Sequence, residues 1–190
     1  HELYSQKIGF VGFGAVARHA AKLLEAFGTE QIFYDPFVKD EKIGLAKKVD
    51  LDTIFIDSDI VSVHLPVTKT TEGMIGKKYF EMMKNDALFV NTSRAAVVNN
   101  EELYDALKTK EIAGGIVDVL DVEPPKDKND YKIAMLDNVI ATPHICGSTH
   151  EVVLHQSEIA VSAIEAFYNK DYDNAKLMNK EVVASATGDK

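Results

Sequence analysis

The sequence predicts an α/β protein built on a Rossmann-type, doubly wound parallel sheet in a single domain. Short apolar segments of strand length alternate with amphipathic segments of helix length, which is typical of a parallel sheet covered by helices. A glycine-rich turn follows the first apolar segment, as in dinucleotide-binding folds. The chain has 190 residues, of which 46% are apolar, and this is enough for one sizeable core.

The strands and helices are expected in regular alternation along the chain. The first strand is Lys7 to Gly12, and a helix follows from Ala15 to Phe27. Later strands are expected at Gln31 to Tyr34, Ile60 to Leu65, Ala87 to Asn91, Gly115 to Leu120 and Val139 to Thr142. Later helices are expected near Thr53 to Asp57, Lys77 to Met83, Glu101 to Lys108 and Ser148 to Tyr168.

Composition gives the expected domain boundary. The segment Glu123 to Asp130 is rich in proline and charge and is predicted to be a loop. Beyond Asn169 the sequence turns polar. Residues 1–170 are therefore expected to form the dinucleotide-binding domain, and residues 171–190 a loose tail or a returning C-terminal segment.

The net charge of −9 and the cysteine count narrow the classes of partner. Acidic and basic residues are interspersed, and no clustered basic face indicates nucleic-acid binding. No apolar run approaches the roughly 18 residues that span a bilayer, so no membrane partner is expected. The single cysteine, Cys146, rules out an intrachain disulfide and favours a reducing, cytoplasmic location. The helical histidines lack the spacing of a zinc site, and no metal is expected.

Residues 12–17 read Gly-Phe-Gly-Ala-Val-Ala, a G-x-G-x-x-A dinucleotide fingerprint. Gly12 permits the tight turn, Gly14 lets the backbone approach a pyrophosphate, and Ala17 allows close helix–strand packing. Asp35 ends the next strand at the expected distance of about 20 residues, where it can accept hydrogen bonds from the adenosine ribose. Because Asp35 would repel a 2′-phosphate, NAD is predicted rather than NADP. The alternative is an ordinary turn followed by an unrelated aspartate.

Candidate catalytic residues follow buried strands, at the edge where open α/β sheets bind ligands. Arg94 can grip a carboxylate with its planar fork of donors. His144 can move protons near neutral pH, and a carboxylate from the segment Asp118 to Pro124 would hold its tautomer. Structural alternatives remain open: Arg94 also fits a surface ion pair, Glu123 a solvated loop acid, and His144 a structural histidine.

Six motifs resemble, in order, those of the D-isomer-specific 2-hydroxyacid dehydrogenase family. They are G-x-G-x-x-A, Tyr-Asp-Pro (34–36), Val-His-Leu-Pro (63–66), Asn-Thr-Ser-Arg (91–94), Asp-Val-Leu-Asp-Val-Glu-Pro (118–124) and Thr-Pro-His (142–144). The phosphoglycerate dehydrogenase branch is most similar, through residues 34–38 and 147–149. The resemblance covers residues 2–180 and departs at Ala95, where the family often has glycine, and at Cys146, where it usually has a small residue.

The resemblance implies a role for each candidate residue. Arg94 would bind the carboxylate and carbonyl of the substrate, His144 would be the acid/base, and Glu123 its partner. The substrate would be a 2-hydroxy or 2-oxo acid, with 3-phosphoglycerate as one candidate, and the cofactor NAD. Residues implied to contact or line the NAD site are Gly12, Gly14, Ala15, Val16, Asp35, His64, Leu65, Pro66, Thr71, Thr92, Ser93, Arg94, Asp118, His144 and Gly147.

The resemblance also implies an NAD-dependent dehydrogenase that forms a homodimer through its NAD domain. The helix after Gly14 and the apolar run Ile112 to Leu120 are the features that motivate this expectation. The family's substrate domain is built mainly from residues that precede the first strand, so most of it is expected to be absent and the chain alone to bind NAD without useful turnover. A non-catalytic NAD-dependent sensing module of the corepressor type remains the alternative. Arg94, Glu123 and His144 favour the enzyme, because a sensor needs no general base.

Overall fold

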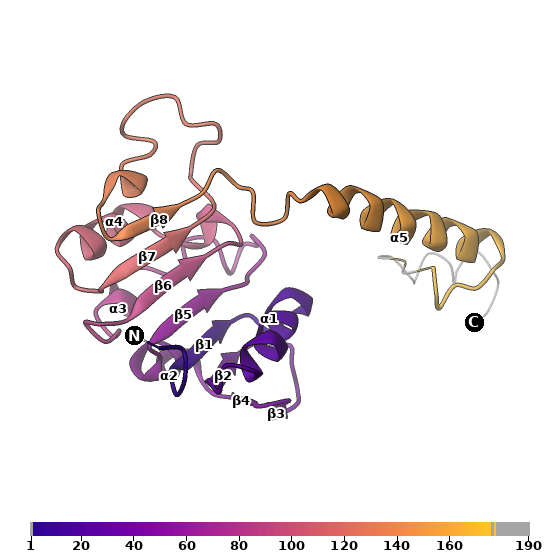
Figure 1. Cartoon of the computed structure of the whole chain (residues 1–190), viewed down its shortest axis with the longest axis horizontal. Helices are drawn as coiled ribbons and strands as arrows, with labels where there is room; N and C mark the ends of the chain where they lie inside the picture. The colour runs from indigo at the N-terminus through magenta and orange to yellow at the C-terminus, as the bar shows by residue number, and fades with distance from the viewer. Residues whose placement is uncertain (1, 176, 178–190) are drawn as a thin grey trace. The chain divides into compact units, whose positions relative to one another are not determined.

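The computed structural model describes residues 2–175 and residue 177. The chain divides into two compact units, His1–Cys146 and Gly147–Lys190 (Figure 1). The domain boundary expected after residue 170 stays a prediction.

The first unit contains the strands and helices that the sequence predicts, together with a short hairpin that it does not. Its strands are β1 (Lys7–Val11), β2 (Glu30–Tyr34), β3 (Lys42–Ile43), β4 (Ala46–Lys48), β5 (Ile60–Val63), β6 (Leu88–Asn91), β7 (Gly114–Val117) and β8 (Val139–Ala141). Its helices are α1 (Ala15–Glu25), α2 (Leu51–Asp57), α3 (Lys77–Phe80), α4 (Asn100–Lys108) and the short 3-10 turns η1 (Ala95–Val97) and η2 (Ile133–Met135). The unexpected hairpin is β3–β4, whose strands of 2 and 3 residues are too short to show an alternating pattern.

The eight strands form one sheet in the order β3-β4-β2-β1-β5-β6-β7-β8. Neighbouring strands are parallel, except that β3 and β4 are antiparallel. The chain builds the sheet outward from β1 in both directions, which confirms the predicted doubly wound fold. The last residue of β1 is in register with Tyr34 and Val63, and the register continues through Asn91, Val117 and Ala141. The carboxyl ends of these strands therefore line up along one edge, where open α/β sheets bind ligands.

The apolar core divides between the two faces of the sheet. On one face, Phe10 and Phe33 pack with Ala17 and Ala21 of α1. On the other face, α2, α3 and α4 contribute Phe55, Phe80 and Leu103 to a larger cluster. Each fully buried phenylalanine stabilises the fold by about 1.5–3 kcal/mol relative to an exposed one. The sequence spaces these residues so that successive strand positions alternate between the two clusters.

Helices of the first unit cover both faces of the sheet only around β1 and β2. On the α1 side of β6 and β7, Leu88, Val90 and Ile116 are half-buried, and Ile140 of β8 is 65% exposed. Within the first unit, helices therefore cover only one face of this half of the sheet. The physical reason is that α2, α3 and α4 all lie on the opposite face, while α1 reaches only the first strands.

The described part of the second unit is mainly the helix α5 (His150–Tyr168). A helix from Ser148 to Tyr168 was predicted, and the observed one begins two residues later. None of its residues is buried. In the described part of the chain, no helix combines the length and the apolar character needed to cross a membrane. The returning segment predicted for residues 171–190 lies mostly outside the described residues.

Candidate active site

The turn between β1 and α1 has the geometry that its glycine pattern predicts. Gly12 has a φ of +87°, which favours glycine, and a Cβ there would lie 2.6 Å from the carbonyl oxygen of His64. Gly14 has no heavy atom within 4 Å of its Cβ position. Ala17 is fully buried, whereas Val16 is 69% exposed. The turn therefore packs tightly on its inner side and leaves open space at the N-terminus of α1, as an anion-binding turn requires.

Asp35, one residue beyond β2, attaches this turn to the neighbouring strand. One carboxylate oxygen accepts a hydrogen bond from the backbone N–H of Phe13 (2.9 Å), and the other accepts one from the backbone N–H of Phe37 (2.8 Å). Each carboxylate oxygen has a further lone pair that can accept from a ribose hydroxyl. Asp35 thus stands at the predicted place, and its contact with a ribose stays a prediction.

His64 and Leu65, at the end of β5, lie against the glycine turn on its inner side. Burial lowers the pKa of His64, and its Nε2 lies 2.9 Å from the hydroxyl of Ser62. A histidine kept neutral in this way is suited to a wall position rather than to proton transfer. Leu65 is buried, and beyond it the hydroxyl of Thr71 donates to the carbonyl oxygen of Pro66 (2.6 Å). This hydrogen bond closes the loop of residues 66–71 that follows β5.

Asn91, the last residue of β6, organises the turn that carries Thr92, Ser93 and Arg94. Its side chain is almost fully buried, and its amide oxygen accepts from the backbone N–H and the hydroxyl of Ser93 (3.0 and 2.9 Å). Its amide nitrogen donates to the carbonyl oxygen of Arg94 (3.0 Å). Arg94 is exposed, and among the described residues no salt bridge includes it. The predicted role of Arg94 in binding a substrate carboxylate stays a prediction.

Asp118, directly after β7, connects β7 to the loop that follows β8. Its carboxylate accepts hydrogen bonds from the hydroxyl of Thr142 and from the backbone N–H groups of Ile145 (2.9 Å) and Cys146 (3.0 Å). Burial alone would raise the pKa of Asp118, but the hydrogen bonds from Thr142, Cys146 and Ile145 outweigh it and lower the pKa to about 2. The side chain is 2% exposed. Asp118 therefore shapes the loop that carries His144, and its predicted contact with a cofactor stays a prediction.

We expect Asp118→Asn to lower the free energy of unfolding by about 2 kcal/mol at neutral pH. Because the folded pKa of about 2 lies below the ordinary 3.8, this stabilisation is fully present above pH 3.8 and is lost as the pH falls through 2. Urea unfolding of both proteins between neutral pH and pH 2 measures the difference. The exposed Asp86→Asn is the matched control and should change little. A difference that stays constant across this range would contradict the expectation.

Glu123 and His144 form a hydrogen-bonded pair. Nδ1 of His144 lies 2.6 Å from Oε2 of Glu123, whose Oε1 accepts from the backbone N–H of Leu120 (2.7 Å). The hydrogen bond from His144 lowers the pKa of Glu123, against the opposing effect of burial. The carboxylate is therefore ionised near neutral pH and holds the imidazole in the tautomer that leaves Nε2 to accept a proton. His144 also has a φ of +56°, in the left-handed region that non-glycine residues adopt uncommonly.

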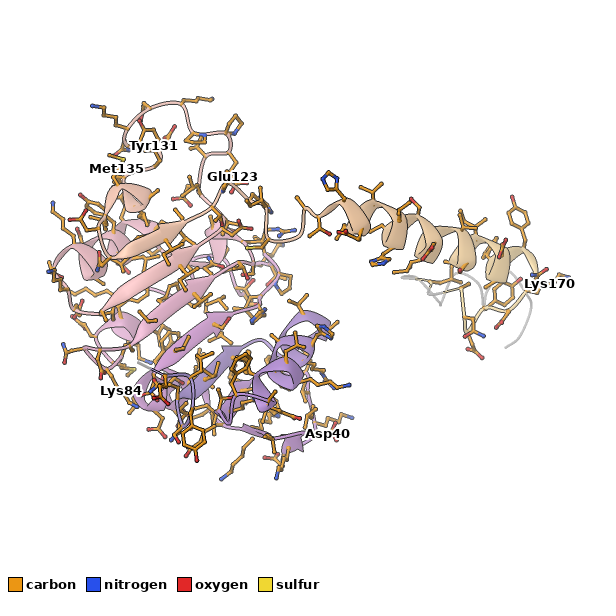
Figure 2. The ribbon with its side chains drawn as sticks, in the orientation of Figure 1. Asp40, Lys84, Glu123, Tyr131, Met135 and Lys170 are labelled. Carbon is orange, nitrogen blue, oxygen red and sulfur yellow. The ribbon has the colours of Figure 1, made fainter. Side chains whose placement is uncertain are left out.

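The strand register brings the predicted residues to one edge of the sheet. Arg94 follows β6 by three residues, Asp118 follows β7 directly, and His144 follows β8 by three residues. The ends of these three strands are adjacent in register. Glu123 lies on the loop after β7, as Figure 2 shows. Gly147 begins the second unit, so its predicted place beside these residues stays a prediction.

Sequence reasoning did not select Asn91 as a site residue, although it belongs to one of the motifs. The signal was a polar residue at the end of a buried strand, since a buried amide must find hydrogen-bond partners. The amide of Asn91 bonds to Ser93 and to the backbone of Arg94, and it thereby positions both residues. Sequence reasoning also did not select Asn100, whose side-chain amide contacts the carbonyl oxygen of Ala95 and the carboxylate of Asp121. A polar residue in the first turn of a helix is common and carries no distinctive signal.

The family-level comparison agrees with this geometry. Residues 1–146 match the NAD binding domain of the D-isomer specific 2-hydroxyacid dehydrogenase family. The chain belongs to this family. The matched residues coincide with the first unit, which is therefore the family's NAD-binding domain. The predicted fold class, family and cofactor are confirmed.

Individual relatives support the same assignment. A putative 2-hydroxyacid dehydrogenase of Bacillus subtilis, YoaD, is 47% identical over 90% of this chain and 52% of its own length. A D-3-phosphoglycerate dehydrogenase of Archaeoglobus fulgidus is 40% identical over 86% of this chain and 31% of its own. The crystal structure of a D-lactate dehydrogenase with NAD⁺ from Lactobacillus jensenii superimposes with a TM-score of 0.81 and 35% identity, over 90% of this chain and 55% of that one. The chain spans about half the length of most curated relatives that it matches.

Proposed function

We propose that the protein oxidises a D-2-hydroxy acid to the 2-oxo acid with NAD and catalyses the reverse reduction. The observation that carries this proposal is the Glu123–His144 pair, joined at 2.6 Å at the same sheet edge as the glycine turn. Family membership supports it. A sensing module has no need of a general base held in one tautomer, so this alternative is not favoured.

The first unit has features that fit NAD. The open space at Gly14 and the N-terminus of α1 suit a pyrophosphate, and Asp35 suits the ribose hydroxyls. When bound, NAD supplies a two-electron acceptor for the hydride on C2 of the substrate. The residues proposed to hold it are Gly12, Gly14, Ala15, Val16, Asp35, His64, Leu65, Pro66, Thr71, Thr92, Ser93, Arg94, Asp118, His144 and Gly147.

Three side chains are proposed to act on the substrate. Nε2 of His144 takes the hydroxyl proton, because Nδ1 is already hydrogen-bonded to Glu123. Glu123 keeps the ring oriented and balances the positive charge that the proton brings. Arg94 binds the substrate carboxylate with its planar fork of donors. In the reduction, His144 returns the proton to the carbonyl oxygen.

The test of this function is the formation of NADH from D- and L-isomers of lactate and glycerate and from D-3-phosphoglycerate. The D-isomers alone should react, and His144→Ala should lower the rate by about 10²-fold or more while NAD still binds. His155→Ala, at an exposed position of α5, is the matched control and should leave the rate unchanged. Binding of NAD without any stereospecific product, even after long incubation, would instead support the sensing module.

We expect NAD to bind about 100-fold or more tightly than NADP, because a 2′-phosphate would meet the carboxylate of Asp35. Asp35→Ala should narrow this ratio. The variant should also lower the affinity for NAD itself, because Asp35 accepts hydrogen bonds from the backbone of Phe13 and Phe37. The ratio of the NAD and NADP affinities is therefore the informative quantity. Calorimetric titration of both dinucleotides measures it, with the exposed Asp40→Ala as the control. Equal affinities in the unmodified protein, or an unchanged ratio in Asp35→Ala, would contradict the expectation.

We propose that two copies of the chain pair through α1. Leu23 on this helix and Phe27 just beyond it are 59% and 55% exposed and lie four residues apart, on one face of the helix. The run Ile112 to Leu120, the other feature that motivates the expected dimer, lies in the interior instead, with Ile112 and Val117 buried. The apolar face of α1 therefore supports the proposal by itself.

Leu23→Arg is expected to convert this dimer to a monomer, because it places a charge in an apolar contact. Sedimentation at micromolar concentration measures the mass of both proteins. Lys22→Ala, on the adjacent exposed position, is the matched control and should remain dimeric. If the unmodified chain is monomeric, or if Leu23→Arg leaves the dimer intact, pairing through α1 is wrong.

The substrate class and cysteine content also support a proposed cytoplasmic location. Cys146 is the single cysteine of the chain and its thiol is exposed. Exposed thiols persist in reducing compartments. Cell fractionation, combined with thiol labelling of Cys146 in each fraction, tests the location.

A further inference from the structure

Asn100, the first residue of α4, joins two loops through its side-chain amide. Its nitrogen lies 3.1 Å from the carbonyl oxygen of Ala95 and 3.2 Å from that of Val98, both in the segment after β6. It also lies 2.7 Å from Oδ1 of Asp121, in the loop after β7. One side chain therefore donates to both segments that follow these neighbouring strands.

Each of the two segments carries a residue of the proposed active site. Ala95 directly follows Arg94, and Asp121 precedes Glu123 by two residues. Among the described residues, no hydrogen bond or ion pair joins the side chain of Arg94 to Glu123. The link through Asn100 runs instead from the backbone next to Arg94 to the carboxylate next to Glu123.

The loop that carries Glu123 depends on such polar contacts. Most of its residues between Asp121 and Asp130 are exposed, and a cavity of about 190 Å³ lies between it and α4. The ion pair between Lys132 and Glu101 attaches the far end of the loop to α4, and the contact of Asn100 with Asp121 attaches the near end. Among the described residues, the hydrogen bond from Asn100 is the contact that holds the side chain of Asp121.

The hydrogen bond from Asn100 acts against other effects on the pKa of Asp121. Partial burial raises the pKa of Asp121, and the charge of Glu101 raises it further, whereas the hydrogen bond from Asn100 and the charge of Lys132 lower it. The contact with Asn100 therefore favours the ionised form of Asp121, which is the stronger hydrogen-bond acceptor.

We propose that Asn100 is a positioning residue that, through Asp121, sets the separation between Arg94 and the Glu123–His144 pair. The inference rests on the proposed function, in which Arg94 holds the substrate carboxylate while His144 takes the proton. A substrate held at both ends requires a fixed separation, and a misplacement of about 1 Å can cost about 10²-fold in rate. Asn100 contacts neither substrate nor cofactor in this proposal and acts through the two segments it joins.

The test uses the 190-residue chain with Asn100→Ala, Asp121→Ala and the double variant. Each single variant should lower the rate with D-2-hydroxy acids by about tenfold through kcat, while NAD affinity stays within about twofold. The double variant should be no slower than either single one, because both changes break the same link. Asp121→Asn keeps an acceptor oxygen for Asn100 and should restore most of the rate.

A second measurement does not depend on turnover. Carbon-13 NMR titration of the Glu123 carboxyl group should show its pKa rising toward the ordinary value in Asn100→Ala and Asp121→Ala, because the pair with His144 loosens. Asp121→Asn should keep the lowered pKa. If the unmodified chain forms no product from any D-2-hydroxy acid even after long incubation, but the Glu123 pKa responds in this way, the positioning role stands and the proposed function fails. If the unmodified chain is active and neither the rate nor the Glu123 pKa responds, the positioning role is wrong. Should Asn100→Ala fail to fold, the two Asp121 variants give the same decision.

Discussion

Gly12→Ala should destabilise the first unit by about 1–3 kcal/mol or more and lower its affinity for NAD by at least about tenfold. The φ of +87° is strained for alanine, and the new methyl group would lie 2.6 Å from the carbonyl oxygen of His64. That oxygen belongs to the backbone after β5 and cannot move away cheaply. The ends of β1 and β5 would therefore separate at the point where the sheet changes direction, which is where the dinucleotide is proposed to bind.

Gly14→Ala is the matched comparison, since it adds the same methyl group two residues away. The φ of Gly14 is −77°, which alanine adopts without strain, and nothing lies within 4 Å of the new atom. The free energy of unfolding should therefore change little. The methyl group occupies the space proposed for the pyrophosphate, so NAD affinity should still fall by about tenfold or more.

Urea unfolding and calorimetric titration with NAD measure the two effects separately. Gly12→Ala should lower both the free energy of unfolding and the affinity for NAD. Gly14→Ala should lower only the affinity for NAD. If Gly14→Ala bound NAD normally, the pyrophosphate could not lie over this turn. If Gly12→Ala were as stable as the unmodified chain, the backbone conformation of the turn would have to differ from the one described.

The sequence predicted the strands near the sheet's centre well because every residue in the runs 60–65 and 87–91 is at least half-buried. These runs contain few polar residues, and such runs indicate buried strands without any tertiary information. The residues at which the strands end were less predictable. The segment Gly115 to Leu120 reads as one strand, but β7 ends at Val117 because the carboxylate of Asp118 turns the chain toward Thr142. That contact spans 24 residues and leaves no local signal.

The candidate site shows the same division between local and long-range information. Gly12, Gly14 and Asp35 could be assigned because a turn and a strand end impose their spacing directly on the sequence. The Glu123–His144 contact was inferred only through the family resemblance, since 21 residues separate the two. Asn91 and Asn100 were missed because their importance comes from which backbone groups they hold in the folded chain. Residues of this kind can be recognised only once the folded structure shows their hydrogen-bond partners.

The 190-residue chain by itself should bind NAD yet oxidise D-2-hydroxy acids well below about 1 s⁻¹, the low end of ordinary turnover. The side chains of His144 and Glu123 are 46% and 35% exposed, and Arg94 is exposed. An exposed contact between arginine and a carboxylate contributes only about 0–1 kcal/mol, so substrate would bind weakly and without a fixed orientation. Good orientation can contribute roughly 7–11 kcal/mol to lowering the barrier.

The measurement is NADH formation at saturating NAD and millimolar substrate, with the longer Bacillus relative assayed in parallel as the control. Any slow product should still form from the D-isomer alone and should disappear in His144→Ala, because the proton acceptor is present even where orientation is poor. A rate at or above about 1 s⁻¹ would contradict the expectation. It would mean that the exposed Arg94 and the Glu123–His144 pair orient the substrate without further walls, and that the water around them costs the reaction far less than exposed charges normally do.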